Sequence, residues 1–160
     1  MFHLVNHALI KGALFMALAG VVLSYQGTSV NDLKGRGRSS PWTMTAFAIG
    51  AVSLIGVPLT AGFQSKYALV NALFEHGWWW AVAVVMFSSL LAVVYMGRIL
   101  EAVFFRTPSN PNKRRQEAPL IILIPLWILA IGNIWVGVHG GFVAGLADDA
   151  ASALFIGGAS

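Results

Sequence analysis

Four long apolar stretches are the strongest constraint on how this sequence folds, and they lie at residues 2–25, 41–74, 78–105 and 118–138. About 20 apolar residues in a helix cross the hydrocarbon core of a bilayer, and inside lipid only helices and closed barrels satisfy every backbone group. Charged residues make up 10% of the chain, whereas a soluble domain carries about 25%. The sequence therefore predicts an all-α, polytopic membrane helix bundle of about four spans in residues 1–140, with a C-terminal tail at 141–160.

The first stretch is expected to remain in the protein as a membrane helix. A signal peptide carries its positive charge before its apolar core and ends at a small-residue cleavage site. Here Lys11 lies within the apolar core of residues 2–25, and no such site follows. The chain has no cysteine, which excludes disulfides, thiolate metal sites and thiol chemistry.

Basic residues predict the orientation. Most of them lie in two polar segments, residues 26–40 and 106–117, which follow the first and third stretches. Because cytoplasmic loops of membrane proteins carry an excess of Lys and Arg, we expect both segments in the cytoplasm and both termini outside. The turn at residues 75–77 then also lies outside, and the three tryptophans at 78–80 meet the interface that indole side chains favour.

The second stretch is longer than one simple crossing requires. A crossing needs about 20 residues, and this stretch also contains Gly56, Pro58 and Gly62. Proline removes a backbone donor and clashes with the preceding turn, so the helix should break there. Broken backbone at membrane depth is tolerated where protein buries it or where it lines a wet cavity, and such helices build ion sites in transporters. We therefore predict a broken-helix hinge at residues 56–62, with Lys66 on the second half.

Lys11 and Lys66 are predicted to lie near the middle of the membrane. Each is roughly 14 Å from the outer end of its stretch at about 1.5 Å per residue, and all 6 Asp and Glu residues fall at span ends, in loops or in the tail. An ionised side chain at the bilayer centre costs about 2.5–3.5 kcal/mol, and desolvation without a counter-ion favours the neutral, proton-accepting amine. The two lysines are therefore candidates to carry protons, the alternative being that they snorkel to the interface.

His3 and His7 precede Lys11 at intervals of four residues, which places all three on one helix face. Histidine accepts and donates protons near neutral pH, so these three residues and Lys66 form a candidate proton path. As alternatives, the histidines form hydrogen bonds at the outer interface or hold a metal ion. Since no carboxylate or third ligand accompanies them in the sequence, we predict no metal and no cofactor.

Other polar residues leave alternatives open. Thr60, Gln64 and Ser65 flank the predicted hinge and hold either water or the backbone groups that the hinge frees. Arg98 and Glu101 are three residues apart and are expected to pair. No Walker motif, dinucleotide fingerprint, nucleophile elbow or zinc pattern is present. A transporter subunit is therefore favoured over an enzyme, with the membrane subunit of a redox-driven pump as the alternative, and no nucleic acid is expected as a partner.

Two sequence runs resemble a known family. HLVNHALIKGALF at residues 3–15 and SLIGVPLTAGFQSK at residues 53–66 are similar to the proton-conducting antiporter family. That family includes antiporter-like membrane subunits of respiratory complex I, of related hydrogenases and of Mrp-type cation/proton antiporters. Residues 77–98 and the run from Glu117 onward most resemble the D-type subunit of Mrp antiporters. The resemblance covers only the C-terminal third of such a subunit, so the chain is expected to be a truncated, split or incomplete part of one.

The resemblance implies a function and partners. It implies the C-terminal part of a proton-translocating subunit of a multisubunit monovalent cation/proton antiporter, with protons hopping through water between Lys11 and Lys66. The implied partners are other membrane subunits of an Mrp-type or complex I-like assembly, protons, sodium as one option for the cation, and the lipid of a bacterial inner (plasma) membrane. The alternatives are a proton-pumping subunit of NADH-quinone oxidoreductase (complex I) or a related hydrogenase, and a scaffold without transport.

Overall fold

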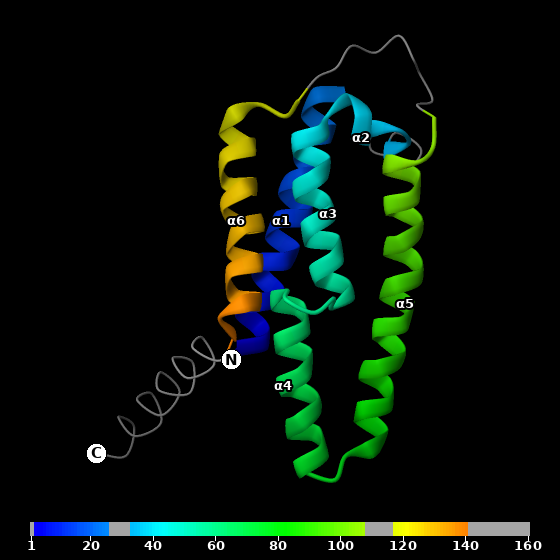
Figure 1. The fold of residues 1–160 in the computed structure, drawn as a ribbon, viewed down its shortest axis with the longest axis vertical. Coiled ribbons are helices and arrows are strands. Elements are labelled where there is room, and N and C mark those ends of the chain that lie inside the picture. Colours follow the sequence, from blue (N-terminus) through cyan, green and yellow to red (C-terminus); the bar gives the residue numbers. More distant parts are fainter. Residues whose placement is uncertain (1, 26–32, 108–116, 141–160) are drawn as a thin grey trace, which may run out of the picture.

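Six helices and no strands form the part of the chain that a computed structural model describes, residues 2–25, 33–107 and 117–140. The helices are α1 (Phe2–Tyr25), α2 (Arg36–Ser39), α3 (Pro41–Ile55), α4 (Ala61–Glu75), α5 (Trp79–Phe104) and α6 (Leu120–Val138) (Figure 1). By length and composition, α1, α5 and α6 are able to cross a membrane, and α3 is a shorter apolar helix. The predicted all-α membrane bundle is confirmed.

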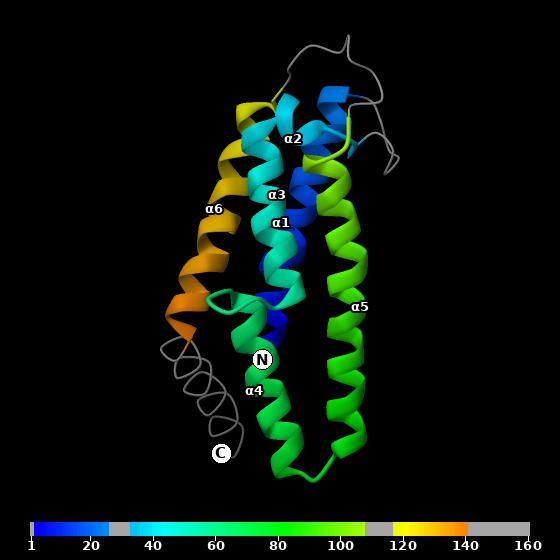
Figure 2. The ribbon, with the colours of Figure 1, turned by 45° about the vertical axis from the view of Figure 1, so that its right-hand side comes forward.

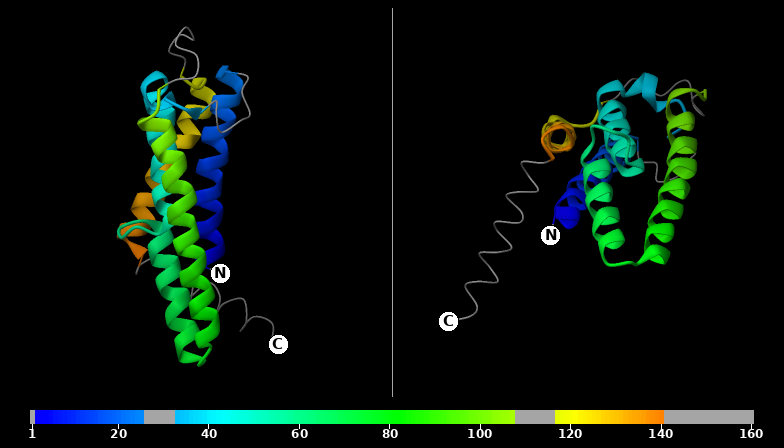
Figure 3. Two further views of the ribbon diagram at one scale, coloured as in Figure 1. Left: turned by 90° about the vertical axis from the view of Figure 1, so that its right-hand side faces the viewer. Right: turned by 60° about the horizontal axis from the view of Figure 1, so that its bottom comes forward.

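The second crossing is divided between two helices. In Figures 1 and 2, α4 continues in the direction of α3 after a short loop, and α5 returns along the full length of the pair. Figure 3 shows α4 and α5 as an antiparallel hairpin closed by a tight turn. Gly77 in that turn has a φ of 70°, a left-handed conformation that glycine adopts without strain. The end of α1 and the starts of α3 and α6 meet at the opposite end of the bundle.

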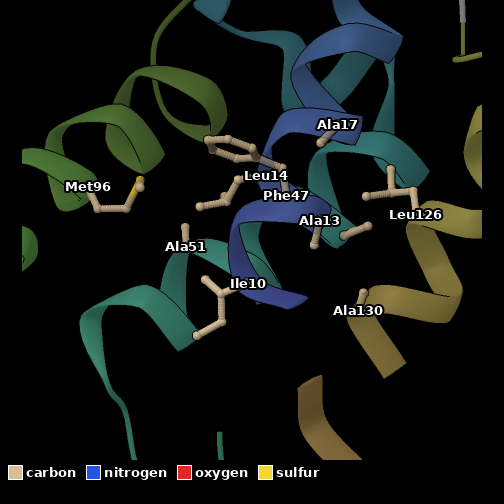
Figure 4. Close-up of a cluster of buried hydrophobic side chains, with 10 residues drawn as sticks. Ile10, Ala13, Leu14, Ala17, Phe47, Ala51, Met96, Leu126 and Ala130 are labelled. Atoms are coloured by element: carbon tan, nitrogen blue, oxygen red, sulfur yellow. The ribbon is translucent and has the colours of Figure 1, made fainter. Parts of the chain in front are cut away.

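The core lies where α1, α3 and α6 pack together, with α5 alongside (Figure 4). Small residues let the helix backbones approach closely, and Ala13, Ala17, Ala51 and Ala130 are buried in this core. Larger side chains fill the spaces between them, including Leu126, which is fully buried. Most large apolar side chains of α5 point outward instead, so this helix presents an apolar surface to its surroundings.

The N-terminus of α3 is held by a carboxylate that follows it in sequence by more than seventy residues. Glu117 accepts hydrogen bonds from the backbone N–H groups of Trp42 (3.1 Å) and Thr43 (3.3 Å) and from the Thr43 hydroxyl (2.9 Å). The first N–H groups of a helix have no partner within the helix, and a negative charge complements the helix dipole at this end. Glu117 therefore caps α3 and fixes the start of α6 beside it.

The prediction that Arg98 pairs with Glu101 is wrong. Glu101 pairs instead with Arg106 at 3.4 Å, and both side chains are more than half exposed. The backbone leaves α5 after Phe104, which brings the residue five positions along the chain within reach. A pair so exposed to its surroundings contributes little to stability.

Candidate functional site

The predicted break near residues 56–62 is present. Helix α3 ends at Ile55, and Gly56 follows with a φ of 91° in the left-handed region. The N–H of Gly56 bonds to the carbonyl of Ser53 (3.0 Å), and the N–H of Val57 bonds to the carbonyl of Val52 (3.3 Å). This is the pattern of a Schellman motif, which closes the end of a helix and satisfies two of its last carbonyls.

A tight turn connects the two half-helices. The N–H of Thr60 bonds to the carbonyl of Val57 at 3.2 Å, with Pro58 and Leu59 between them. Leu59 has a φ of 70°. Proline at the second position and a positive φ at the third are features of a type II turn, in which glycine is the usual third residue. The hinge therefore places a leucine in a conformation that is unfavourable for any residue other than glycine, asparagine or aspartate.

Lys66 satisfies the two carbonyls that remain at the end of α3. Its Nζ donates to the carbonyl oxygens of Leu54 (3.0 Å) and Ile55 (2.9 Å). A Cβ atom on Gly56 would lie 3.4 Å from the Nζ and 3.2 Å from the Cδ of Lys66, so a glycine here also leaves room for the lysine. A cation at a helix C-terminus is favoured by the helix dipole. Both hydrogen-bond partners of the ammonium group in the structure are backbone carbonyls.

The peptide group that joins Ala61 to Gly62 is also held by side chains. The N–H of Gly62 donates to the Ser53 Oγ (3.2 Å), and the Ser53 hydroxyl donates to the Oδ1 of Asn133 on α6 (2.8 Å). On α1, the Nδ2 of Asn6 donates to the carbonyl of Ala61 (3.3 Å). Sequence reasoning missed Asn6 and Asn133, although an asparagine within an apolar span was an available signal.

The polar residues that flank the hinge bind backbone groups. The Thr60 hydroxyl donates to the carbonyl of Val57 (2.6 Å), and the Ser65 hydroxyl donates to the carbonyl of Gly62 (3.1 Å). The Gln64 amide reaches the carbonyl of Gly137 on α6 (3.2 Å). Of the two alternatives for these residues, the structure supports the role of satisfying backbone groups.

A cavity of about 330 Å³ brings together three of the four predicted proton-path residues. His3 and His7 from α1 and Lys66 from α4 all line it. The two imidazole rings are stacked with their centroids 5.8 Å apart. From α5 the cavity receives Ser88 and Tyr95, which sequence reasoning did not single out. The two histidines and Lys66 therefore share one space, although α1 and α4 are far apart in the sequence.

Lys11 lies outside this group of lining residues. It is exposed on α1, on the face that also carries His3 and His7. His7 lies within electrostatic reach of both Lys11 and Lys66. Lys11 therefore continues the stripe along α1, at the surface of the described residues.

Lys66 also lines a second cavity, of about 260 Å³. Lys66 lines both cavities, and Tyr67 and Ser89 line only the second. Leu54 lines the first cavity and Ile55 the second, so the two carbonyls that bind the ammonium group belong to residues that line different cavities. Lys66 therefore borders both cavities. Within the described ranges, no three His, Asp or Glu side chains gather as metal ligands would.

Known proteins are similar to this chain in sequence and in fold. Residues 1–92 match the family "NADH:quinone oxidoreductase/Mrp antiporter, TM". The chain is 37% identical over 150 residues to NADH-quinone oxidoreductase subunit N of Desulforudis audaxviator (strain MP104C), covering 86% of this chain and 30% of that protein. It therefore spans less than a third of the length of that relative.

Two solved structures share the arrangement of helices. The first is that of the membrane-bound sulfane sulfur reductase, an archaeal respiratory membrane complex, with a TM-score of 0.78 and 32% identity over 85% of this chain and 23% of the other. The second is that of the Mrp complex from Dietzia sp. DQ12-45-1b, with a TM-score of 0.79 over 89% of this chain and 34% of the other. At 22% identity, the second likeness concerns the fold alone.

Proposed function

The chain is an integral membrane protein that belongs to the NADH:quinone oxidoreductase/Mrp antiporter family, and from this premise we propose that it moves protons. In this proposal it is the C-terminal part of a proton-translocating membrane subunit of a multisubunit monovalent cation/proton antiporter. The observation that carries the proposal is the cavity shared by His3, His7 and Lys66. A cavity of about 330 Å³ has room for several water molecules, since each occupies about 30 Å³ in the liquid.

The geometry at Lys66 suits proton exchange. A lysine ammonium carries three N–H donors, and two are accounted for by the carbonyls of Leu54 and Ile55. A neutral amine keeps two N–H groups, so Lys66 is able to release one proton without leaving either carbonyl unpaired. The proton it releases is the one not used for capping, and the shared cavity offers the imidazoles of His3 and His7 as acceptors, directly or through water.

Lys11 extends the path in this proposal. It is exposed at the surface of the described residues, on the face of α1 that carries the two histidines. A charged side chain facing lipid is unfavourable, so we expect another part of the assembly to cover this face. The proposed partners are the remainder of the subunit and the other membrane subunits, with sodium as one option for the exchanged cation.

A second candidate is a proton-pumping subunit of a respiratory complex. The 37% identity to NADH-quinone oxidoreductase subunit N favours it. Mass spectrometry of the complex purified from native membranes in mild detergent distinguishes the two candidates. Mrp subunits in the complex would support the antiporter, and subunits with flavin or iron–sulfur groups would support the respiratory assignment.

The proposed location is a bacterial inner membrane. Arg36 and Arg38 of α2 and Arg106 after α5 lie at one end of the bundle, and the turn after α4 lies at the other (Figure 1). By the positive-inside rule the arginine end is cytoplasmic, which places both termini outside. The variants Arg38→Cys and Glu75→Cys, both at exposed positions, should react with an impermeant maleimide from opposite sides of the membrane. Labelling of both from the same side would refute this topology.

The proton-transfer proposal is tested with Lys66→Met and Lys66→Arg in the complete complex. Arginine keeps a charged hydrogen-bond donor but does not release its proton, so both variants should lose at least about 90% of proton transport. Lys34→Met, a lysine replaced outside the cavity, is the matched control and should transport normally. Transport is measured in inverted vesicles with a pH-sensitive dye. Normal transport by assembled Lys66→Met and Lys66→Arg would refute the proposal.

A further inference from the structure

Three helices hold a single peptide group at the hinge. Asn6 of α1 binds the carbonyl of the Ala61–Gly62 peptide, and Ser53 of α3 binds its N–H. The two groups of a trans peptide point in opposite directions, and no cis peptide is present in the described residues. The peptide is therefore held from opposite sides. Asn133 of α6 accepts the Ser53 hydroxyl hydrogen at 2.8 Å and fixes its direction. We call Asn6, Ser53 and Asn133 the peptide clamp.

The clamp uses amide groups at positions where apolar side chains would be expected. Asn6 and Asn133 are fully buried, and the Oδ1 of Asn6 and the Nδ2 of Asn133 have no hydrogen-bond partner in the structure. Leaving a buried polar atom unpaired is unfavourable, whereas a leucine of similar shape carries no such cost. Packing alone therefore does not account for two asparagines here, and we attribute their presence to the hydrogen bonds that they form with Ala61 and Ser53.

The clamp binds both helices that define the position of Lys66, α3 and α4. Ser53 directly precedes Leu54 and Ile55, whose carbonyls bind the lysine Nζ. Gly62 lies about one helical turn before Lys66 on the same helix. The bond from the Gly62 N–H to the Ser53 hydroxyl thus joins the helix that carries the lysine to the helix that receives it.

Helix α6 also packs against the turn between α3 and α4. A Cβ atom on Gly137 would collide with the backbone of Leu59 and Thr60, so α6 packs directly on the turn. The carbonyl of Gly137 also accepts a hydrogen bond from Gln64. Helix α6 lies beyond residues 1–92, which match the family, yet it supplies Asn133 to the hinge.

We propose that Asn133 and Ser53 are positioning residues for proton transfer, because they hold α3 and α4 so that the Lys66 ammonium group stays on the Leu54 and Ile55 carbonyls. This inference rests on the proposed function, in which Lys66 exchanges protons. Asn6 completes the arrangement by holding the carbonyl side of the same peptide. If the clamp is loosened, Lys66 loses its fixed place at the border of the two cavities while its charge and the histidines remain.

The test uses Asn133→Leu, Ser53→Ala and Ser53→Thr in the complete complex, beside wild type and Lys66→Met. Proton transport is measured from pH 5 to pH 9, with the amount of assembled complex measured in parallel. The titratable groups that line the two cavities with Lys66 are His3 and His7 from α1, Tyr67 from α4 and Tyr95 from α5. Lys11 lines neither cavity and lies within electrostatic reach of His7. None of the clamp variants alters them.

We expect Asn133→Leu and Ser53→Ala to assemble and to transport protons at least about fivefold more slowly than wild type at neutral pH. The plot of their transport rate against pH should be displaced to lower pH by roughly one unit. The displacement follows because carbonyl acceptors favour the charged form of an amine, and the variants weaken that contact. Ser53→Thr keeps the hydroxyl and should retain more than about half of the wild-type rate, in line with the modest effect of substitutions that keep a hydrogen bond.

Three results would overturn the positioning role. The first is a wild-type rate and profile in assembled Asn133→Leu and Ser53→Ala, while Lys66→Met remains inactive. The second is equal loss in Ser53→Thr and Ser53→Ala, since the hydroxyl would then not matter. The third is failure of both Asn133→Leu and Ser53→Ala to accumulate, which would make the clamp a folding element. Normal transport by Lys66→Met would instead refute the proposed function, whatever the clamp variants do.

Discussion

Replacing Glu117 tests whether α3 depends on a charged group at its N-terminus. The carboxylate accepts three hydrogen bonds there, two from backbone N–H groups and one from the hydroxyl of Thr43, which is almost completely buried. Glu117→Ala removes every acceptor at once. Glu117→Gln keeps one acceptor oxygen but removes the charge, so the two variants separate hydrogen bonding from charge.

The expected loss of stability follows from these contacts. Loss of a side-chain cap costs about 1 kcal/mol, and removal of a negative charge from a helix N-terminus costs about 0.5 kcal/mol. Leaving the buried Thr43 hydroxyl without its acceptor costs about 1 kcal/mol more. Glu117→Ala should therefore lower the free energy of unfolding by about 2–3 kcal/mol, and Glu117→Gln by about 1 kcal/mol.

The measurement is reversible unfolding of the full chain in mixed micelles with increasing SDS, followed by tryptophan fluorescence. Glu101→Ala is the control, because its carboxylate is 55% exposed and pairs only with Arg106 among the described residues. It should change the free energy of unfolding by less than about 0.5 kcal/mol. If Glu117→Ala were no more destabilising than Glu101→Ala, the capping argument would be wrong.

Two glycine substitutions test the hinge in the same unfolding assay. A Cβ atom on Gly62 would collide with the carbonyl oxygen of Ser53, so Gly62→Ala should destabilise the chain by more than about 4 kcal/mol. The control is Gly97→Ala on α5, where an added Cβ meets open space. It should be neutral or should stabilise the chain by up to about 1 kcal/mol. Equal effects would refute the close approach at Gly62. Gly56→Ala forces alanine to a φ of 91° beside Lys66 and should cost about 1–2 kcal/mol. Its control is Gly132→Ala on α6, which meets no neighbour, and a similar cost in both would contradict the strain argument.

The sequence was sufficient to predict the hinge because the causes are local. Proline and glycine act on their own backbone and on the preceding turn, so Gly56, Pro58 and Gly62 predict a break without knowledge of the fold. The excess length of the stretch supports the same prediction. The left-handed φ of Gly56 and the turn around Pro58 agree with it.

The long-range partners of the hinge and of the α3 N-terminus could not be predicted, because they depend on tertiary packing. Asn6, Glu117 and Asn133 each bind a residue more than fifty positions away in the sequence. Helix geometry places His3 and His7 on one face with Lys11. It does not decide which part of that face the neighbouring helices bury, and in the structure the histidines line the cavity while Lys11 is exposed.

The requirement to satisfy backbone groups gives Lys66 a structural role beside the proposed role in proton exchange. A helix that ends at membrane depth leaves carbonyls without helical partners, and these must be bound by other protein groups or by water in a cavity. Lys66 supplies two donors to the end of α3, so it stabilises the hinge whether or not it moves a proton. Loss of transport in Lys66→Met therefore combines a lost cap with a lost proton carrier. Lys66→Arg separates them, because guanidinium still donates to carbonyls and stays protonated. An arginine variant that is as stable as wild type but does not transport would assign proton exchange to the lysine itself.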